Sequence, residues 1–280
     1  MRIFISCDME GITGVAIGKH CNPAEAEYQR FRKLMTRDVN AAIEGAASAG
    51  ATEFLVCDGH GPMTNILIED LDPRAELMSG SNKHFCQMEG IDTGFDGAFF
   101  IGYHAREGGD DGVVNHTLMG VAVTELRCNG KVIGETGLNA GLAGAFGVPV
   151  VMLSGDNVVA EEARTLLGDV EAAVVKQAVN RHAARLLSVK NAQDAIRERA
   201  AEAVRRLRDR SFQPYVVPGP ITFEIDFKTT DAAHMACLFP CNERLSSKTV
   251  AVAAADYPTA FKQLWGTLIL GAKTMGGVLS

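Results

Sequence analysis

The sequence lacks the long apolar segment that a membrane-spanning helix requires. No stretch of about 18 residues is both apolar and free of charge. The first eight residues show neither the apolar core nor the small-residue cleavage site of a secretory signal. The 7 cysteines are an odd number and are scattered, which is typical of free thiols in a reducing compartment. We therefore expect a cytoplasmic protein that does not bind membranes.

An excess of basic residues is also missing. Lysine and arginine total 27 against 34 aspartates and glutamates, so the formal net charge is −7. Proteins that bind phosphate backbones usually carry the opposite sign, and we expect no nucleic-acid partner. The sequence also contains no HExxH, GxSxG or CxxC motif, and no GxGxxG after a predicted strand. These absences argue against a HExxH zinc protease, a serine hydrolase of the nucleophile-elbow type and a dinucleotide-binding enzyme.

What is present is the pattern of an α/β protein. Short apolar runs alternate with longer helical patterns, which predicts a mostly parallel sheet in a three-layer domain. After the proline-rich segment 214–220, a strand, a helix, a strand and a final helix predict a smaller two-layer α+β unit. We place the boundary near residue 186, giving a catalytic domain over 1–186 and a small C-terminal domain over 187–280.

Polar side chains that bind metals follow three separate strand candidates. The segments at these strand ends are Asp8-Met-Glu10, Asp58-Gly-His60 and Tyr103-His104. Loops at the carboxyl ends of parallel strands converge on one crevice, so these side chains are expected to lie together. If residues 8–10 stay extended, both carboxylates point to the same side. Mixed carboxylate and imidazole ligands suit Zn²⁺, Mn²⁺ or a similar divalent ion, and the number of ligands is sufficient for two ions.

Two further residues are weaker candidates from spacing alone. Glu135 is predicted to open a helix, where the helix dipole favours a carboxylate without any metal. His116 lies in a long loop rich in glycine and aspartate, and it could be an exposed histidine or a proton donor aimed into the crevice. Each histidine taken singly has a structural alternative, and it is their joint placement at strand ends that favours a metal site.

At these residues the sequence resembles the D-aminopeptidases of peptidase family M55. The matching segments run in family order over more than half of the chain: Ser6-Cys-Asp-Met-Glu-Gly-Ile-Thr-Gly14, Asp58-Gly-His60 with Asn65, Met88-Glu-Gly-Ile-Asp92, Gly102-Tyr-His-Ala-Arg106, His116, Gly134-Glu-Thr-Gly-Leu-Asn-Ala140, Ser154-Gly-Asp156 and Lys176-Gln177.

The resemblance implies a zinc-dependent aminopeptidase that acts on short peptides with an N-terminal D-residue. It implies that two Zn²⁺ ions per subunit are held, with Asp8 bridging, by Asp8, Glu10, His60, His104 and Glu135. Ligand chemistry alone would also allow Mn²⁺ or Co²⁺. The resemblance further implies that His116 is the catalytic histidine, and that the chains form a homo-oligomeric ring, a decamer of stacked pentamers.

The departures from the family pattern lie on the expected substrate side. Asn115 and Thr117 flank His116 where we expect serines, and Gly61 and Pro62 replace bulkier polar residues after His60. These changes leave the choice of substrate open. Another metal-dependent amidase or a phosphoesterase remains an alternative, although only Arg106 and Lys19 near the motifs could clamp a phosphate. A peptide-binding protein without activity and a structural ring protein are the non-enzymatic alternatives.

Overall fold

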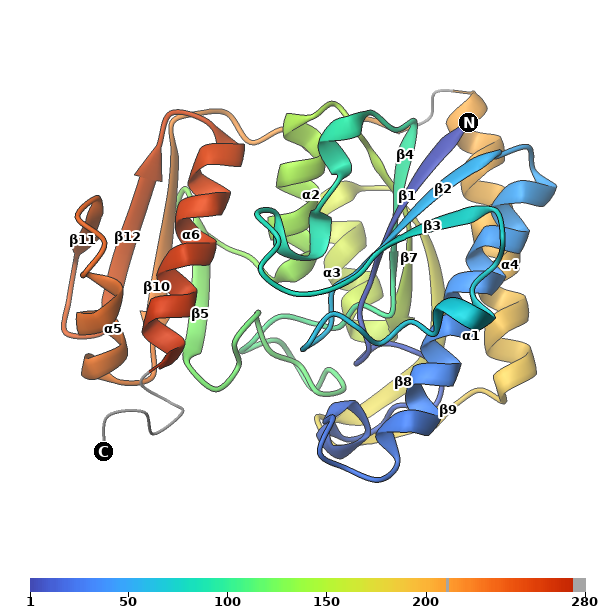
Figure 1. The fold of residues 1–280 in the computed structure, drawn as a ribbon, viewed down its shortest axis with the longest axis horizontal. Helices are drawn as coiled ribbons and strands as arrows, with labels where there is room; N and C mark the ends of the chain where they lie inside the picture. Colours follow the sequence, from blue (N-terminus) through green and yellow to red (C-terminus); the bar gives the residue numbers. More distant parts are fainter. Residues whose placement is uncertain (210–211, 274–280) are drawn as a thin grey trace.

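A computed structural model describes residues 1–209 and 212–273, which form two β-sheets with their helices (Figure 1). Seven strands form the first sheet, and all neighbours are parallel except the last pair. In spatial order they are β3 (Ala75–Met78), β2 (Glu53–Asp58), β1 (Arg2–Cys7), β4 (Gly97–Ile101), β7 (Val150–Asp156), β8 (Glu171–Asn180) and β9 (Ala183–Leu186). The central strand β4, Gly-Ala-Phe-Phe-Ile, is buried throughout, as expected for a parallel strand covered on both faces.

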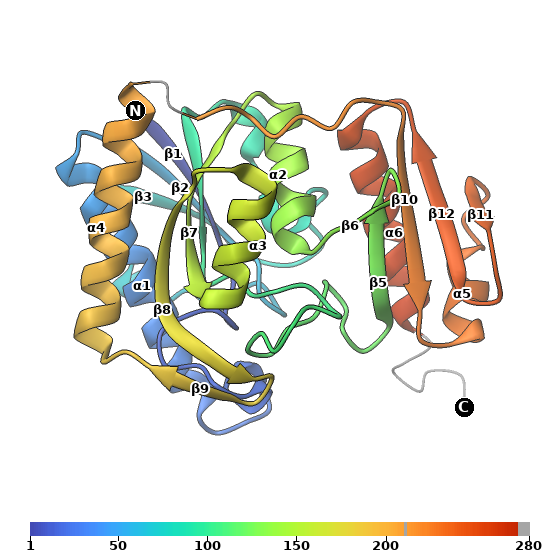
Figure 2. The ribbon, with the colours of Figure 1, turned by 180° about the vertical axis from the view of Figure 1, so that it is seen from behind.

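Helices cover both faces of this first sheet, which gives the predicted three layers (Figure 2). Helices α1 (Tyr28–Ser48) and α4 (Val189–Arg208) pack against each other and against one face. Helices α2 (Glu135–Ala145) and α3 (Asn157–Leu167) lie on the other face, against β7. The predicted α/β class with a mostly parallel sheet is confirmed.

The second sheet is smaller and antiparallel. Its order is β11 (Asn242–Arg244), β12 (Thr249–Ala254), β10 (Ile221–Phe227), β5 (Val123–Cys128) and β6 (Lys131–Val132). Burial alternates along β10 because one face packs against α5 (Thr230–Ala236) and α6 (Tyr257–Ala272). The predicted hairpin turns at Asn129 and Gly130, both at positive φ (48° and 79°).

The elements of the two sheets do not separate at the boundary predicted near residue 186. Helix α4 lies after that boundary but packs on the first sheet, whereas the hairpin β5–β6 lies before it and joins the second sheet. Helices α2 and α6 also touch, and one hydrophobic cluster runs from Phe100 in the first sheet to Phe223 in the second. The chain therefore crosses between the two sheets more than once, and the division into domains 1–186 and 187–280 stays a prediction, with residues 210–211 and 274–280 outside the described residues.

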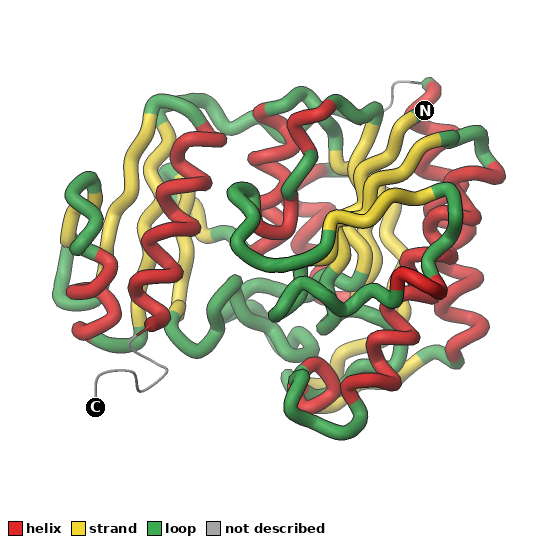
Figure 3. Tube along the Cα trace, viewed as in Figure 1, coloured by secondary structure: helices red, strands yellow, loops and turns green. Residues whose placement is uncertain are grey.

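The tube view separates helices, strands and the long loops that lead to the carboxyl edge of the first sheet (Figure 3). Among residues 1–209 and 212–273, no helix combines the length and the apolar character needed to cross a bilayer.

Candidate metal centre and cavity

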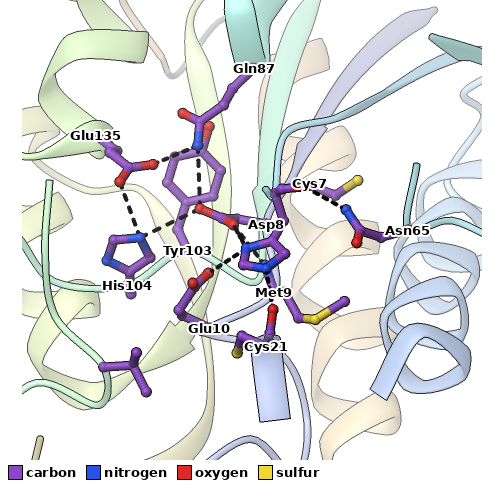
Figure 4. Close-up of polar contacts among 12 residues, drawn as sticks. Cys7, Asp8, Met9, Glu10, Cys21, Asn65, Gln87, Tyr103, His104 and Glu135 are labelled. Atoms are coloured by element: carbon purple, nitrogen blue, oxygen red, sulfur yellow. Dashed lines mark hydrogen bonds and ion pairs between the residues drawn. The ribbon is translucent and has the colours of Figure 1, made fainter. Parts of the chain in front are cut away.

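The predicted site residues converge where the order of the first sheet reverses. Strand β1 has β2 on one side and β4 on the other. The chain therefore leaves β1 and β4 in opposite directions, and a crevice opens between the loops that follow these two strands. Asp8 directly follows β1, His60 lies two residues after β2, and His104 lies three residues after β4. The structure brings all three into one buried cluster around Asp8, of which Figure 4 labels Asp8 and His104.

Two glycines allow the loops after β1 and β4 to touch. The Gly11 amide donates to the carbonyl of Gly102 at 2.7 Å. A side chain at Gly11 would place its Cβ 1.9 Å from the Tyr103 carbonyl oxygen, and one at Gly102, where φ is +75°, would lie 2.2 Å from the Asp8 carbonyl oxygen. This close approach sets the distance between Asp8 and His104.

The two oxygens of Asp8 face different histidines. Oδ1 lies 3.2 Å from Nδ1 of His60, and Oδ2 lies 3.5 Å from Nε2 of His104. Glu10 adds a second carboxylate beside His60, at 3.1 Å from Nδ1, and Glu135 adds one beside His104, at 3.2 Å from Nε2. Asp8 is thus shared between one half built on Glu10 and His60 and another built on His104 and Glu135.

Glu10 reaches the cluster by a different route from the one predicted. Strand β1 ends at Cys7, and the chain turns at Glu10 rather than continuing extended. The extended path that would align Asp8 and Glu10 by a period of two is therefore not followed, although both carboxylates lie beside Nδ1 of His60. Glu135 opens α2 as predicted and points from the helix start into the cluster.

Hydrogen bonds fix the tautomers of both histidines so that lone pairs face the carboxylates. Nε2 of His60 lies 2.8 Å from the Cys21 carbonyl and must donate to it, which leaves Nδ1 as an acceptor. Nδ1 of His104 likewise donates to the Ala105 carbonyl at 3.0 Å, and its buried Nε2 has no hydrogen-bond partner among the described residues. Lone pairs that face carboxylate oxygens repel unless a cation lies between them, so these residues suit a divalent metal.

The electrostatics of the metal-free chain support the same interpretation. Burial opposes the charged form of His60, but Glu10 and then Asp8 raise its pKa well above the usual range. Burial likewise opposes the charge on His104, while Glu135 and Asp8 raise its pKa. Without a metal, protons would have to occupy the positions where a cation fits.

His116 lies at the mouth of the cluster in the long loop between β4 and β5. Its ring stacks on that of His104, with centroids 4.2 Å apart, and its Nε2 lies 3.8 Å from Oε1 of Glu135. Nδ1 donates to the Val114 carbonyl at 2.9 Å, which leaves Nε2 free to exchange a proton. The predicted catalytic histidine and the predicted ligands are therefore adjacent.

The loop around His116 is held in an uncommon conformation. Val114 and Leu118, on either side of His116, have positive φ values of 51° and 55°, which branched and bulky side chains rarely adopt. The conformation lets the Leu118 amide donate to Oε1 of Glu135 at 2.7 Å, and the Val114 amide donates to the Arg181 carbonyl at 2.9 Å. Such strain persists only where surrounding contacts determine it, and here those contacts orient His116.

Two groups of side chains place one ligand atom each within 4.8 Å of all the others. They are Asp8 with Glu10 and His104, and His104 with His116 and Glu135. His116 therefore lies within reach of a metal ion held by His104 and Glu135 as well as of the cavity.

Sequence reasoning missed the residues that orient the carboxylates. The Gln87 carboxamide donates to Oε2 of Glu135 at 2.5 Å and lies 3.3 Å from Oδ2 of Asp8. Its oxygen accepts from Asn139 at 2.6 Å, and Asn139 also donates to the Tyr103 hydroxyl. Asn139 lies four residues after Glu135 on α2, a spacing that places both on one helix face and could have identified it. Gln87 lies in a 3-10 turn, Cys86–Met88, and no sequence pattern marked it.

A buried lysine secures the loop that carries Glu10. Nζ of Lys176 donates to the carbonyls of Glu10, Ile12 and Val15 at 2.6, 3.0 and 2.8 Å. The side chain is only 1% exposed, and burial lowers its pKa to about 8. Lys176 was part of the family resemblance, but nothing in the sequence assigned it this role.

The cluster opens into a cavity of about 220 Å³. Four of the five predicted ligands and His116 line one part of it, and Met63, Leu118, Met119 and Trp265 line another. No lysine or arginine is among the lining residues of the described chain. The cavity can therefore hold a small ligand between a polar, metal-binding side and an apolar side.

Comparison with known proteins points to one family. Residues 1–265 match peptidase family M55, described as D-aminopeptidase. The chain is 37% identical over 265 residues to a D-aminopeptidase of Bacillus subtilis, covering 94% of this chain and 95% of that protein. It superposes with a TM-score of 0.93 on the solved structure of the Zn-dependent D-aminopeptidase DppA from Bacillus subtilis, a self-compartmentalizing protease, at 35% identity and 98% coverage of both chains.

Proposed function

The chain belongs to the D-aminopeptidases of peptidase family M55 and is a peptide-bond hydrolase, and we propose that it removes N-terminal D-residues from short peptides and amides with two zinc ions. The observation that carries the proposal is the division of the Asp8 carboxylate between His60 and His104, with Glu10 and Glu135 completing the two halves. Asp8, Glu10, His60, His104 and Glu135 would hold the ions, and the lone pairs of the two histidines already face inward.

Zinc bound there supplies Lewis-acid chemistry, polarising the scissile carbonyl and lowering the pKa of water. The chain supplies the rest. Gln87 holds the Asp8 and Glu135 carboxylates in place, and His116 presents Nε2 for proton transfer to the leaving amine or donation to the developing oxyanion. His116 also lines the cavity, so a departing amine held there would lie near its ring.

The cavity supports a peptide over a phosphate ester as the substrate. Enzymes that transfer or hydrolyse phosphoryl groups commonly add a cationic clamp, and the described lining contains no lysine or arginine. Arg106 and Lys19, the two cations near the motifs, do not line the cavity. A metal-dependent amidase with another substrate remains the second candidate because it would use the same residues.

Self-association belongs to the same proposal. The related DppA is a self-compartmentalizing protease, and we infer a ring-shaped homo-oligomer, a decamer, for this chain. Mn²⁺ or Co²⁺ could replace Zn²⁺ at ligands of this type. A cytoplasmic location stays a prediction from the sequence.

The deciding experiment compares matched D-Ala and L-Ala p-nitroanilides and dipeptides. The protein is assayed as isolated, after chelation, and after zinc is restored. We expect metal-dependent release confined to the D-series. Release from neither series with about two metals per chain would contradict the peptidase proposal, and it would favour another amidase substrate or a binding role.

A further inference from the structure

The apolar side of the cavity combines residues from loops of the first sheet with one residue from a helix of the second. Trp265 lies on α6, which packs on the second sheet, whereas Leu118 and Met119 follow His116 in the long loop. Trp265 is also the single tryptophan of the chain. The second sheet therefore contributes a large aromatic side chain to a cavity whose polar residues all come from the loops and helices of the first.

On this apolar side, Leu118, Met119 and Trp265 pack against the hydrophobic core. Behind Trp265 and Leu118, the space enclosed by tightly packed side chains leaves no volume for a water molecule. The packed residues are Cys86, Leu138, Phe261, Leu264 and Leu268, each at most 2% exposed. The indole is partly exposed, but toward these packed residues there is no room for even a water molecule, so the indole limits the cavity in this direction.

An aminopeptidase needs a closed end on one side of the scissile bond and an open end on the other. Nothing precedes the N-terminal residue of the substrate, whereas the rest of the peptide must leave the site. Resting on the proposed function, we propose that Trp265, with Leu118 and Met119, receives the side chain of the N-terminal residue and sets the upper limit of its size.

The volume and chemistry of the cavity define the side chains that fit. About 220 Å³ is below the roughly 300–1,000 Å³ of sites for drug-sized ligands, so the residue in the closed end must be small. The three wall side chains offer no ion-pair partner, and burying a charge against them would be costly. The substrates are therefore peptides whose first residue is small and apolar.

Kinetics on a series with one constant leaving group tests the wall directly. The zinc-loaded enzyme is assayed with p-nitroanilides of D-Ala, D-Leu and D-Phe, and the variants are Trp265→Ala and Trp265→Phe. In Trp265→Ala the ratio of kcat/KM for D-Phe to that for D-Ala should rise about tenfold or more, because the wall has moved back. Trp265→Phe should give a smaller rise in the same direction.

A matched control variant tests whether loss of any nearby aromatic ring changes turnover in general. A second substrate series tests whether Trp265 contacts the leaving group instead of the side chain of the first residue. Phe239→Ala removes an aromatic ring beside α6 that does not line the cavity, and it should leave the ratio unchanged. D-Ala substrates with leaving groups of increasing size are compared in parallel. An unchanged D-Phe to D-Ala ratio in Trp265→Ala would overturn the proposal, as would a change confined to the leaving-group series.

The single tryptophan also gives a readout that needs no turnover. Titration of the wild-type protein with the hydroxamates of D-Ala, D-Leu and D-Phe should change the Trp265 emission saturably, with affinity falling as the side chain grows. Failure of every D-substrate to be hydrolysed would defeat the proposed function. Absence of a saturable, size-dependent emission change would defeat the wall, whatever the activity or the folding of the variants.

Discussion

The imidazole rings of His104 and His116 are stacked, with centroids 4.2 Å apart and planes within 8° of parallel. Each ring is fixed by a hydrogen bond from Nδ1 to a backbone carbonyl, of Ala105 and Val114 respectively. Both Nε2 atoms consequently point toward Glu135, at 3.2 and 3.8 Å from its Oε1. The inner ring is placed for a metal, and the outer ring is placed to exchange a proton beside it.

Replacement of His116 by alanine should abolish most turnover without removing metal. Loss of a positioned proton donor typically costs about 10²–10⁴-fold in rate, while the five other candidate ligands remain. The measurement is kcat on a D-Ala p-nitroanilide together with zinc per chain by elemental analysis. His182→Ala, an exposed histidine elsewhere, is the control. Loss of zinc from the His116 variant would instead make His116 a ligand.

Replacement of Gln87 by alanine should weaken metal binding. Gln87 contacts both Asp8 and Glu135, and groups that orient ligands typically contribute about 10–100-fold to affinity. Competition with a chelator of known affinity measures the change. Gln29→Ala on the exposed side of α1 should bind zinc like the wild type. Unchanged zinc affinity in the Gln87 variant would show that Asp8 and Glu135 hold their positions without it.

The sequence predicted the parallel sheet and the proximity of most candidate site residues because both depend on local patterns. The apolar run from Gly97 to Tyr103 and the turn at Asn129-Gly130 are each recognisable from local sequence alone. Asp8, His60 and His104 were recognisable because a strand end places its next residues at the crevice. The family resemblance added the roles of Glu135 and His116.

Residues whose roles depend on long-range packing were not predictable in this way. Trp265 reaches the cavity only because α6 packs beside α2, far away in the sequence. Gln87 acts from a short 3-10 turn with no periodicity, and the turn at Glu10 departs from the extended path assumed for it. The hairpin β5–β6 paired with β10 rather than with the first sheet, and the alternation of its residues could not indicate which partner it would take.

The buried Asp38 should make stability fall as the pH rises through its titration. Burial raises the pKa of Asp38 to about 6, with the Thr13 amide and Lys176 opposing the rise. An unfolded aspartate titrates near 3.9, so the folded state binds more protons between about pH 4 and pH 6. The stabilisation that the protonated form provides is complete below about pH 4, and it is lost as pH rises through about 6.

Comparison of Asp38→Asn with the wild type isolates this effect, since the amide cannot ionise and keeps an acceptor for Thr13. The variant should match the wild type near pH 4 and exceed its free energy of unfolding by on the order of 2–3 kcal/mol near pH 7. Urea denaturation at several pH values measures the difference, with the exposed Asp194→Asn as control. A difference that stays constant with pH would contradict the raised pKa.

Replacement of Lys176 by methionine should both destabilise the chain and loosen the metal centre. Methionine has a similar length but no donor, so the three carbonyls that Lys176 satisfies would be left without it. Each buried polar group without a partner costs about 1–3 kcal/mol. Because one of these carbonyls belongs to Glu10, we expect zinc affinity to fall together with the melting temperature of the zinc-free protein.

Lys190→Met on the exposed start of α4 removes a lysine whose partner is the neighbouring Asp194. It should change neither the zinc affinity nor the melting temperature, because exposed pairs contribute little to stability. If the Lys176 variant is destabilised but binds zinc normally, the Gly11–Gly102 hydrogen bond suffices to position Glu10. If the Lys176 variant loses both stability and zinc affinity, the buried ammonium group is needed to hold the loop of Glu10 in the conformation that binds zinc.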